Sequence, residues 1–184
     1  MSTHSLNVTE TCGPVPFASG TCWYAIHTYF QNEKKIVTSL QNAGMETFLP
    51  VTTELHQWSD RKKRIDVPLF PGYAFVRMVA TVENCARVCH TPRVLRLLGS
   101  QPDMPTPVPD AEIDAIRLLT AKRVGLSPHA FLEAGQKVRI CGGSLDGVEG
   151  VMVRRGNDSS LVVSVNLIHK AVAFNLQGYR VEPI

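Results

Sequence analysis

The sequence predicts an α+β protein with two domains, a mixed domain of strands and helices followed by a small β-barrel. A length of 184 residues is enough for two small domains whose cores need neither metals nor disulfides. The stretch QPDMPTPVPD, residues 101–110, holds four prolines and predicts a boundary, because proline disfavours helices and central strands. Beyond Ala134 the helical period disappears, and short strand patterns separated by glycine turns predict the barrel.

The first domain is predicted to follow the order β-α-β-β-β-α-β. Residues 22–30 are rich in strand formers, and Asn32 is placed to cap a helix that Gly44 ends. Apolar residues recur at helical spacing inside that helix: Ile36, Val37, Leu40 and Ala43. Strand patterns also lie near residues 47–49, 54–58, 65–69, 73–78 and 94–98, and a second helix covers about 82–90.

A helix over residues 110–119 is predicted to connect the two domains. Acidic residues occupy its first turn, and Lys122 and Arg123 lie near its end, which suits the helix dipole. Five strand patterns follow: 137–141, 150–154, 161–165, 171–175 and 179–181. Their alternating β-branched residues and interspersed glycines favour strands over a helical hairpin. Strands this short bury their apolar faces only by curling into a barrel.

Composition limits the cellular compartments and the classes of partner that are possible for the protein. The formal net charge of +3 is too small to prove a nucleic-acid partner, so the position of the charges matters more. No stretch approaches ~18 uninterrupted apolar residues, and the amino terminus lacks the basic start and apolar run of a secretory signal. Five cysteines without a framework spacing indicate free thiols in a reducing compartment. We therefore expect a disordered tail at residues 1–21, no membrane contact and a cytoplasmic monomer.

The sequence contains no catalytic or metal-binding constellation. Residues 143–150 superficially resemble a phosphate loop, but they lack its glycine spacing and open a strand instead of a helix. Cys85, Cys89 and His90 lie in one helical pattern, yet further zinc ligands are absent at a recognisable spacing. We therefore expect a protein that is not an enzyme and that uses no cofactor and no metal.

The segment IDVPLFPGYAFVRM, residues 65–78, places two aromatics and a proline at a bend between two strand patterns. Small polar residues are more usual at such a bend, so these side chains suggest a contact with a partner. The aromatics of the first domain are Trp23, Tyr24, Tyr29, Phe70, Tyr73 and Phe75. Most should lie in the core, but those on the second face of the sheet cannot all do so.

Basic residues of the first domain gather in a hairpin turn and around two helices. They are Lys34, Lys35, Arg61, Lys62, Lys63, Arg64, Arg87, Arg93 and Arg96. The hairpin cluster is interpreted either as a solvated turn or as a surface that faces phosphates, and the residues alone leave both open.

Two regions together resemble the NusG family of transcription elongation factors. The first combines Trp23-Tyr24-Ala25-Ile26 with PLFPGYAFV at residues 68–76. The second is the barrel, which begins GQKVRI at residues 135–140 and turns at GVEG at 147–150. The resemblance covers roughly residues 22–184. It implies a tail at 1–21, an amino-terminal NGN domain at 22–100, a linker with a helix at 101–134 and a KOW domain at 135–184.

Shorter stretches resemble specialised paralogs of that family. PLFP at residues 68–71 and NLIHK at 166–170 are similar to RfaH. SPHAFL at 127–132 and LVVSV at 161–165 are similar to UpxY, a regulator of surface-polysaccharide operons. This resemblance implies action on specific operons, such as those for polysaccharide biosynthesis.

The family resemblance implies that the NGN domain binds the clamp helices of bacterial RNA polymerase, bridges the DNA cleft and suppresses pausing or termination. The positions that match the binding depression are Trp23, Phe70, Tyr73 and Phe75, and we expect the polymerase-facing aromatics to be uncovered in the free protein. RfaH makes a second polymerase contact through a His-Thr-Thr triplet. This chain departs from it with Val82, Glu83 and Asn84.

The resemblance also implies two further contact surfaces. Non-template or upstream DNA would face the basic residues Lys34, Arg61, Lys62, Lys63, Arg64, Arg87 and Arg93. Ribosomal protein NusE or Rho would bind the KOW domain at a loop made of Leu167, Ile168, His169 and Lys170. The rival hypothesis is an RNA- or ribosome-binding protein that uses the sheet aromatics and the barrel. Against it, the first domain lacks the signature pattern of RNA-binding sheets.

Overall fold

The computed structural model describes residues 20–57, 62–101, 104–122, 124–129, 135–155 and 158–184. Three α-helices and the strands of four sheets make up this part of the chain, so the predicted α+β class is confirmed. No helix of the described residues is long and apolar enough to cross a membrane. Residues 1–19 of the tail predicted at 1–21, and the hairpin tip at 58–61, lie outside the described residues.

The first sheet is antiparallel and has the strand order β2-β5-β1-β6, with β9 also paired to β1. Its strands are β1 (Cys22–Thr28), β2 (Glu46–Phe48), β5 (Tyr73–Met78), β6 (Val94–Leu97) and β9 (Pro107–Val108). Strand β9 joins this sheet from within the proline-rich stretch. Proline fits there because short edge strands tolerate a missing backbone donor.

Helices α1 (Glu33–Asn42) and α2 (Val82–Cys89) pack against one face of this sheet. Tyr24 and Ile26 of β1 form one buried cluster with Ile36 and Leu40 of α1 and Val88 of α2. Alternate residues of β1 therefore pack against the apolar face of α1, whose helical spacing the sequence predicted. Asn32 takes the N-cap position, but its side chain makes no cap hydrogen bond. Its amide group instead contacts Phe30 and Arg93, so the expected side-chain cap is wrong.

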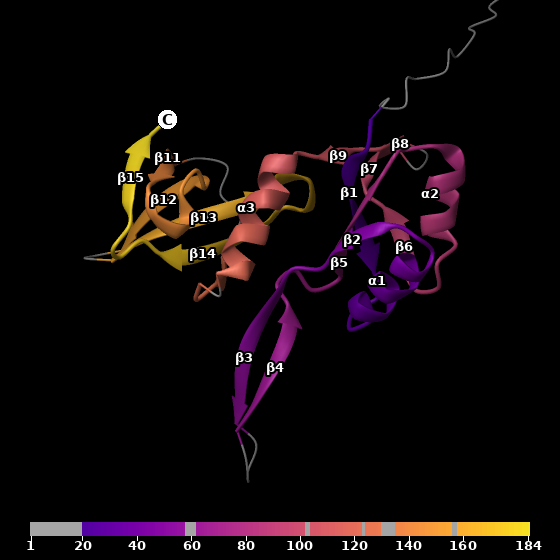
Figure 1. Ribbon diagram of the computed structural model, residues 1–184, viewed down its shortest axis with the longest axis horizontal. Helices are drawn as coiled ribbons and strands as arrows, with labels where there is room; N and C mark the ends of the chain where they lie inside the picture. The colour runs from indigo at the N-terminus through magenta and orange to yellow at the C-terminus, as the bar shows by residue number, and fades with distance from the viewer. Residues whose placement is uncertain (1–19, 58–61, 102–103, 123, 130–134, 156–157) are drawn as a thin grey trace, which may run out of the picture.

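Two smaller ribbons extend from the first sheet. Strands β3 (Val51–Gln57) and β4 (Lys62–Pro68) form a long antiparallel hairpin, which projects away from the rest of the protein (Figure 1). Strands β7 (Gly99–Gln101) and β8 (Met104–Pro105) form a short ribbon before the connecting helix.

The carboxy-terminal barrel has the strand order β10-β14-β13-β12-β11-β15. Its strands are β10 (Ser127–His129), β11 (Gln136–Cys141), β12 (Glu149–Arg155), β13 (Asp158–Val165), β14 (Lys170–Asn175) and β15 (Arg180–Pro183). The expected strands, rather than a helical hairpin, are thus confirmed. Strand β10 lies in the stretch expected as linker and pairs with β14. A Cβ atom on Gly150 would lie 2.5 Å from the Val162 carbonyl oxygen, so the close approach of β12 and β13 requires glycine.

Helix α3 (Asp110–Ala121) lies between the first sheet and the barrel (Figure 1). Its apolar side chains Ile113, Ile116 and Leu119 are fully buried. They belong to one continuous cluster that includes Trp23 and Phe75 of the first sheet and Val163 of the barrel. The connecting helix therefore unites both domains in one core, and it covers the sheet face opposite α1 and α2.

Candidate functional site

The sheet face that looks toward α3 carries a row of aromatic residues. Trp23, Ala25 and His27 alternate along β1 onto this face, because successive strand residues point to opposite sides. Ala25 pairs with Phe75 of β5, which pairs in turn with Phe48 of β2. Phe48 and Phe75 stack with their ring centroids 6.1 Å apart. This set, together with Tyr73, is called the aromatic face below.

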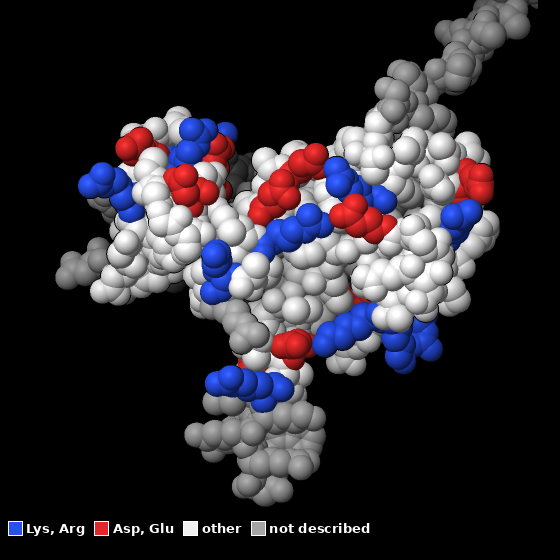
Figure 2. Space-filling model, in the orientation of Figure 1, with Lys and Arg blue, Asp and Glu red and all other residues white. Residues whose placement is uncertain are grey.

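One end of the aromatic face is covered by Arg117 of α3. Its guanidinium carbon lies 4.9 Å from the Trp23 ring centroid and 5.2 Å from that of Phe48, within cation–π range. Glu46 of β2 holds the same guanidinium at 3.4 Å and also pairs with Arg77 at 3.5 Å. Acidic and basic side chains therefore lie next to one another where α3 meets the first sheet (Figure 2). The Trp23 indole is therefore buried, and the Phe48 ring is half-buried.

The other end of the aromatic face is open. His27 and Tyr73 face each other across β1 and β5, and their rings stack with centroids 5.1 Å apart and planes 19° apart. Both side chains are half-buried. A stacked pair that stays partly exposed can accept a further apolar or aromatic group from a partner.

The bend before Tyr73 is held by a buried carboxylate. Glu33 is 2% exposed, and its Oε1 accepts a hydrogen bond of 2.7 Å from the Gly72 N–H. Gly72 has a φ of 82°, which favours glycine, and its carbonyl accepts from the Thr28 N–H at 2.9 Å. The first turn of α1 therefore fixes the bend that presents Tyr73.

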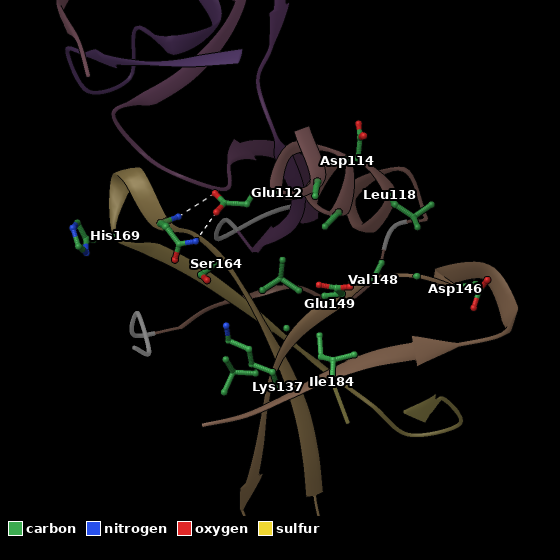
Figure 3. Close-up of a pocket in the computed structure, with 17 residues that line it drawn as sticks. Glu112, Asp114, Leu118, Lys137, Asp146, Val148, Glu149, Ser164, His169 and Ile184 are labelled. Carbon is green, nitrogen blue, oxygen red and sulfur yellow. Dashed lines mark hydrogen bonds between the residues drawn. The ribbon is translucent and has the colours of Figure 1, made fainter. Parts of the chain in front are cut away.

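A concave surface lies between α3 and the barrel, apart from the aromatic face. It is a groove of about 750 Å³, and Figure 3 shows side chains of α3 facing those of the barrel across it. Leu118, Val148 and Ile184 give it apolar walls, while Glu112 and Glu149 are among its acidic lining residues. The groove is thus mixed in character, with carboxylates among apolar side chains.

Glu112 links the two walls of this groove. Its carboxylate accepts hydrogen bonds from the Asn166 backbone N–H at 3.1 Å and from the Asn166 side-chain amide at 2.5 Å. Burial raises the pKa of Glu112, and the two hydrogen bonds from Asn166 oppose that rise. Asn166 begins the short 3-10 turn η2 (Asn166–Ile168), so α3 contacts the barrel at the segment expected to bind partners.

Comparison with known proteins places this fold in a family. A family model described as "Transcription termination factor nusG" matches residues 21–117, just over half of the chain. The chain belongs to the NusG family. The transcription termination/antitermination protein NusG of Pseudomonas aeruginosa is 28% identical over 173 residues, with 88% of this chain and 98% of that protein covered. NusG of Escherichia coli K12 is 27% identical over 172 residues, with 87% and 94% covered.

A solved structure supports the fold of this NusG-family chain. The structure described as "Domain interaction in Thermotoga maritima NusG" superposes with a TM-score of 0.52 at 20% identity. The match covers 88% of this chain and 97% of that one. At this identity the likeness concerns the fold, and it supports a NusG-like first domain followed by a β-rich second part.

The residues expected to face polymerase are mostly buried in this NusG-family chain. Trp23 and Phe70 are 2% exposed and Phe75 is 0% exposed, whereas Tyr73 is half-buried. The expectation that these aromatics are uncovered is therefore wrong for three of the four. The reason is that they share the cluster into which α3 inserts its own apolar side. Of the expected set, Tyr73 alone keeps appreciable exposure.

The basic residues expected to face DNA are distributed over several elements. Lys34 and Arg64 are exposed, and the Lys34 ammonium donates to the Asp66 carbonyl at 2.8 Å, which joins α1 to β4. Figure 2 shows basic side chains gathered beside α1 and on the hairpin. Arg61 and the side chains of Lys62 and Lys63 lie outside the described residues. Two further members, Arg87 and Arg93, pair with Glu83 on α2 and with Asn32 before α1, respectively.

The expected partner loop of the barrel is only partly accessible. Ile168 is 5% exposed and belongs to the buried cluster, and Leu167 is half-buried. His169 and Lys170 are exposed, and His169 has a φ of 48°. The expectation of an available loop is therefore wrong for Ile168, because the 3-10 turn folds this side chain into the core.

The sequence interpretation missed several residues of the site. His27 is found by continuing the alternation from Trp23 and Ala25, but only Phe, Tyr and Trp were counted as aromatics. Arg117 and Glu46 are 71 positions apart, so no local pattern signals their contact. Among the described residues, no group of three or more His, Cys, Asp and Glu could hold a metal ion.

Proposed function

We propose that this NusG-family chain is a non-enzymatic, cytoplasmic transcription elongation and antitermination factor that binds the clamp helices of bacterial RNA polymerase. The observation that carries the proposal is the stacked pair of His27 and Tyr73 at the open end of the aromatic face. Partly exposed aromatics on a rigid sheet are typical anchors of protein interfaces. Family membership supports polymerase as the partner.

The mechanism is differential binding to two states of the polymerase. A factor that bridges the DNA cleft binds the closed, elongating state more tightly than open or paused states, and therefore shifts the population toward elongation. The exposed basic residues beside α1 and on β4, such as Lys34 and Arg64, lie where they could face upstream or non-template DNA. Specific operons, such as those for polysaccharide biosynthesis, are the proposed targets.

The barrel would supply a second partner site. His169 and Lys170 are the exposed side chains of the expected loop, and ribosomal protein NusE or Rho is the proposed partner. The hydrogen bonds between Glu112 and Asn166 hold the start of this loop on α3. A partner that binds this loop would therefore contact a part of the barrel that is hydrogen-bonded to α3, the helix that packs on the first sheet.

Binding of core polymerase to the immobilised full-length chain tests the proposal, with isolated clamp helices as the competitor. We expect capture of polymerase, and we expect Tyr73→Ala to weaken it by about 2 kcal/mol, as for an aromatic at an interface centre. Gln41→Ala is the control, because Gln41 is exposed on α1, on the opposite side of the sheet from the aromatic face. Capture of ribosomes or free RNA without polymerase would support the rival RNA-binding function instead.

A further inference from the structure

The hairpin of β3 and β4 leaves the first sheet with little apolar support. Its described side chains, such as Val51 and Ile65, are half-buried or exposed and belong to none of the buried clusters. A two-stranded ribbon in water is only marginally stable unless it packs against another element. This ribbon nevertheless projects from the protein in a defined direction (Figure 1). Contacts at its base therefore have to hold that direction.

One of these contacts comes from Lys34, which lies in the first turn of α1. Its ammonium donates a hydrogen bond of 2.8 Å to the Asp66 carbonyl of β4, 32 positions away in the chain. The Asp66 carboxylate in turn accepts a hydrogen bond of 2.8 Å from the Thr53 hydroxyl of β3. Lys34 is thus connected to both strands of the hairpin near its base.

The position of Lys34 within its helix indicates what this hydrogen bond does. A cation in the first turn lies at the positive end of the helix dipole, where acidic residues are favoured. The bond to the carbonyl offsets this disadvantage, because a hydrogen bond from an ionised donor is stronger than a neutral one. The Lys34 side chain is exposed, and exposed charged contacts contribute little to global stability. Its main effect is therefore on the orientation of the hairpin.

The first turn of α1 also holds the other end of segment 66–72, which joins the hairpin to Tyr73. The Glu33 carboxylate accepts a hydrogen bond of 2.7 Å from the Gly72 N–H. Between these two anchors, Phe70 is 2% exposed and belongs to the core. The segment is thus held at both ends and buried in the middle, so the hairpin and Tyr73 keep a constant relative position.

We propose that Lys34 is a positioning residue, which fixes the direction of the hairpin relative to Tyr73 through its hydrogen bond to the Asp66 carbonyl. A surface whose two parts are held in advance loses less entropy when both parts bind. The inference rests on the proposed function for the use of this arrangement, in which polymerase contacts Tyr73 while DNA contacts the exposed Arg64 of β4. The orientation itself requires no polymerase.

Residual dipolar couplings of the backbone N–H groups in the full-length protein test the proposal, because they report the direction and the order of each element in solution. In the parent, one alignment tensor should fit both the hairpin and the first sheet. Lys34→Met keeps the apolar stem and loses the ammonium, and it should reduce the couplings of β3 and β4 relative to those of the sheet. Lys34→Arg keeps a cationic donor and should restore them. Lys35→Met, at the exposed neighbouring position, removes the same charge and should leave them unchanged.

Polymerase binding gives a second readout. Lys34→Met should weaken binding to the DNA-loaded elongation complex by roughly three- to tenfold, which corresponds to the cost of ordering a loosened segment on association. Binding to core polymerase without nucleic acid should fall by less, because only Tyr73 and its surroundings are then engaged. Lys34→Arg should bind like the parent in both assays.

Two results would overturn the inference. The first is a Lys34→Met protein whose hairpin couplings equal those of the parent; if this variant also bound the DNA-loaded complex more weakly, Lys34 would be a direct phosphate contact. The second is a Lys34→Arg protein whose couplings are reduced as much as those of Lys34→Met. The inference and the proposed function can fail separately. If the parent captures no polymerase, the proposed function is wrong, whereas reduced couplings in Lys34→Met would still establish the positioning role.

Discussion

The carboxylate of Glu33 accepts a hydrogen bond of 2.7 Å from the backbone N–H of Gly72, 39 positions away in the chain. This contact joins the first turn of α1 to the bend that precedes Tyr73. It explains why a charged residue is buried at this point, since a carboxylate that accepts backbone hydrogen bonds recovers part of its lost hydration. The position of Tyr73 in the stacked pair with His27 therefore depends on Glu33, which lies on α1.

Removing this carboxylate should loosen the bend. Glu33→Ala leaves the Gly72 N–H unsatisfied and should lower the free energy of unfolding by about 1–3 kcal/mol. Glu33→Gln keeps one acceptor oxygen and should cost less. Urea denaturation measures both. Glu83→Ala is the control, because Glu83 is exposed and pairs with Arg87 on the surface of α2, and a change within about 0.5 kcal/mol is expected there. Equal stability of Glu33→Ala and the parent would contradict the assigned role.

Arg117 should stabilise the packing of α3 on the aromatic face. Arg117→Met keeps much of the apolar stem but loses the cation over Trp23 and Phe48, and should cost about 1–2 kcal/mol. In a Trp58→Phe background Trp23 is the remaining tryptophan, because the chain has two. Its emission should then shift to the red on the loss of Arg117. An unchanged spectrum and stability would show that Arg117 does not cover the indole.

Stability at the α3 groove should depend on pH through Glu112. Burial raises the pKa of Glu112, so its favourable contribution is present below the ordinary glutamate pKa, about 4.3, and is lost as the pH rises through the folded-state pKa. Glu112→Gln can still accept from Asn166 and carries no charge. Its stability relative to the parent should therefore increase between about pH 4 and neutral pH.

Urea titrations at a series of pH values check this prediction. Asp114→Asn, an exposed position on the same helix, controls for the loss of one negative charge. The prediction is wrong if the difference in free energy of unfolding between Glu112→Gln and the parent stays constant with pH.

The close approach of the paired strands β12 and β13 leaves no room for a side chain at Gly150. Gly150→Ala would place a Cβ atom 2.5 Å from the Val162 carbonyl oxygen, which is backbone and cannot rotate away. We expect a loss of about 1–3 kcal/mol, in the range of overpacked cores, measured by thermal melting. Gly125→Ala is the matched control, because nothing lies within 4 Å of its added Cβ. A Gly150→Ala variant as stable as Gly125→Ala would contradict the close approach of β12 and β13 at this position.

The sequence by itself determined the main elements and their order, but not the short strands β7 to β10. Alternating apolar residues such as Val163 and Val165 predict strands, and the helical spacing of Ile36 and Leu40 predicts α1, because these periods arise within a few residues. The same local information favoured strands over a helical hairpin in the carboxy-terminal part. The aromatics at the bend before and at Tyr73 also suggested a contact with a partner.

Only the tertiary structure decided which aromatics are covered and which are open. A strand pattern shows that Trp23 and His27 share a face, but not that α3 lies over one and leaves the other half-exposed. The contacts that settle this, Arg117 with Glu46 and Glu112 with Asn166, join residues more than fifty positions apart. Such contacts depend on which apolar faces pack together in the core. A local pattern shows that a face is apolar, but it does not show which element covers that face.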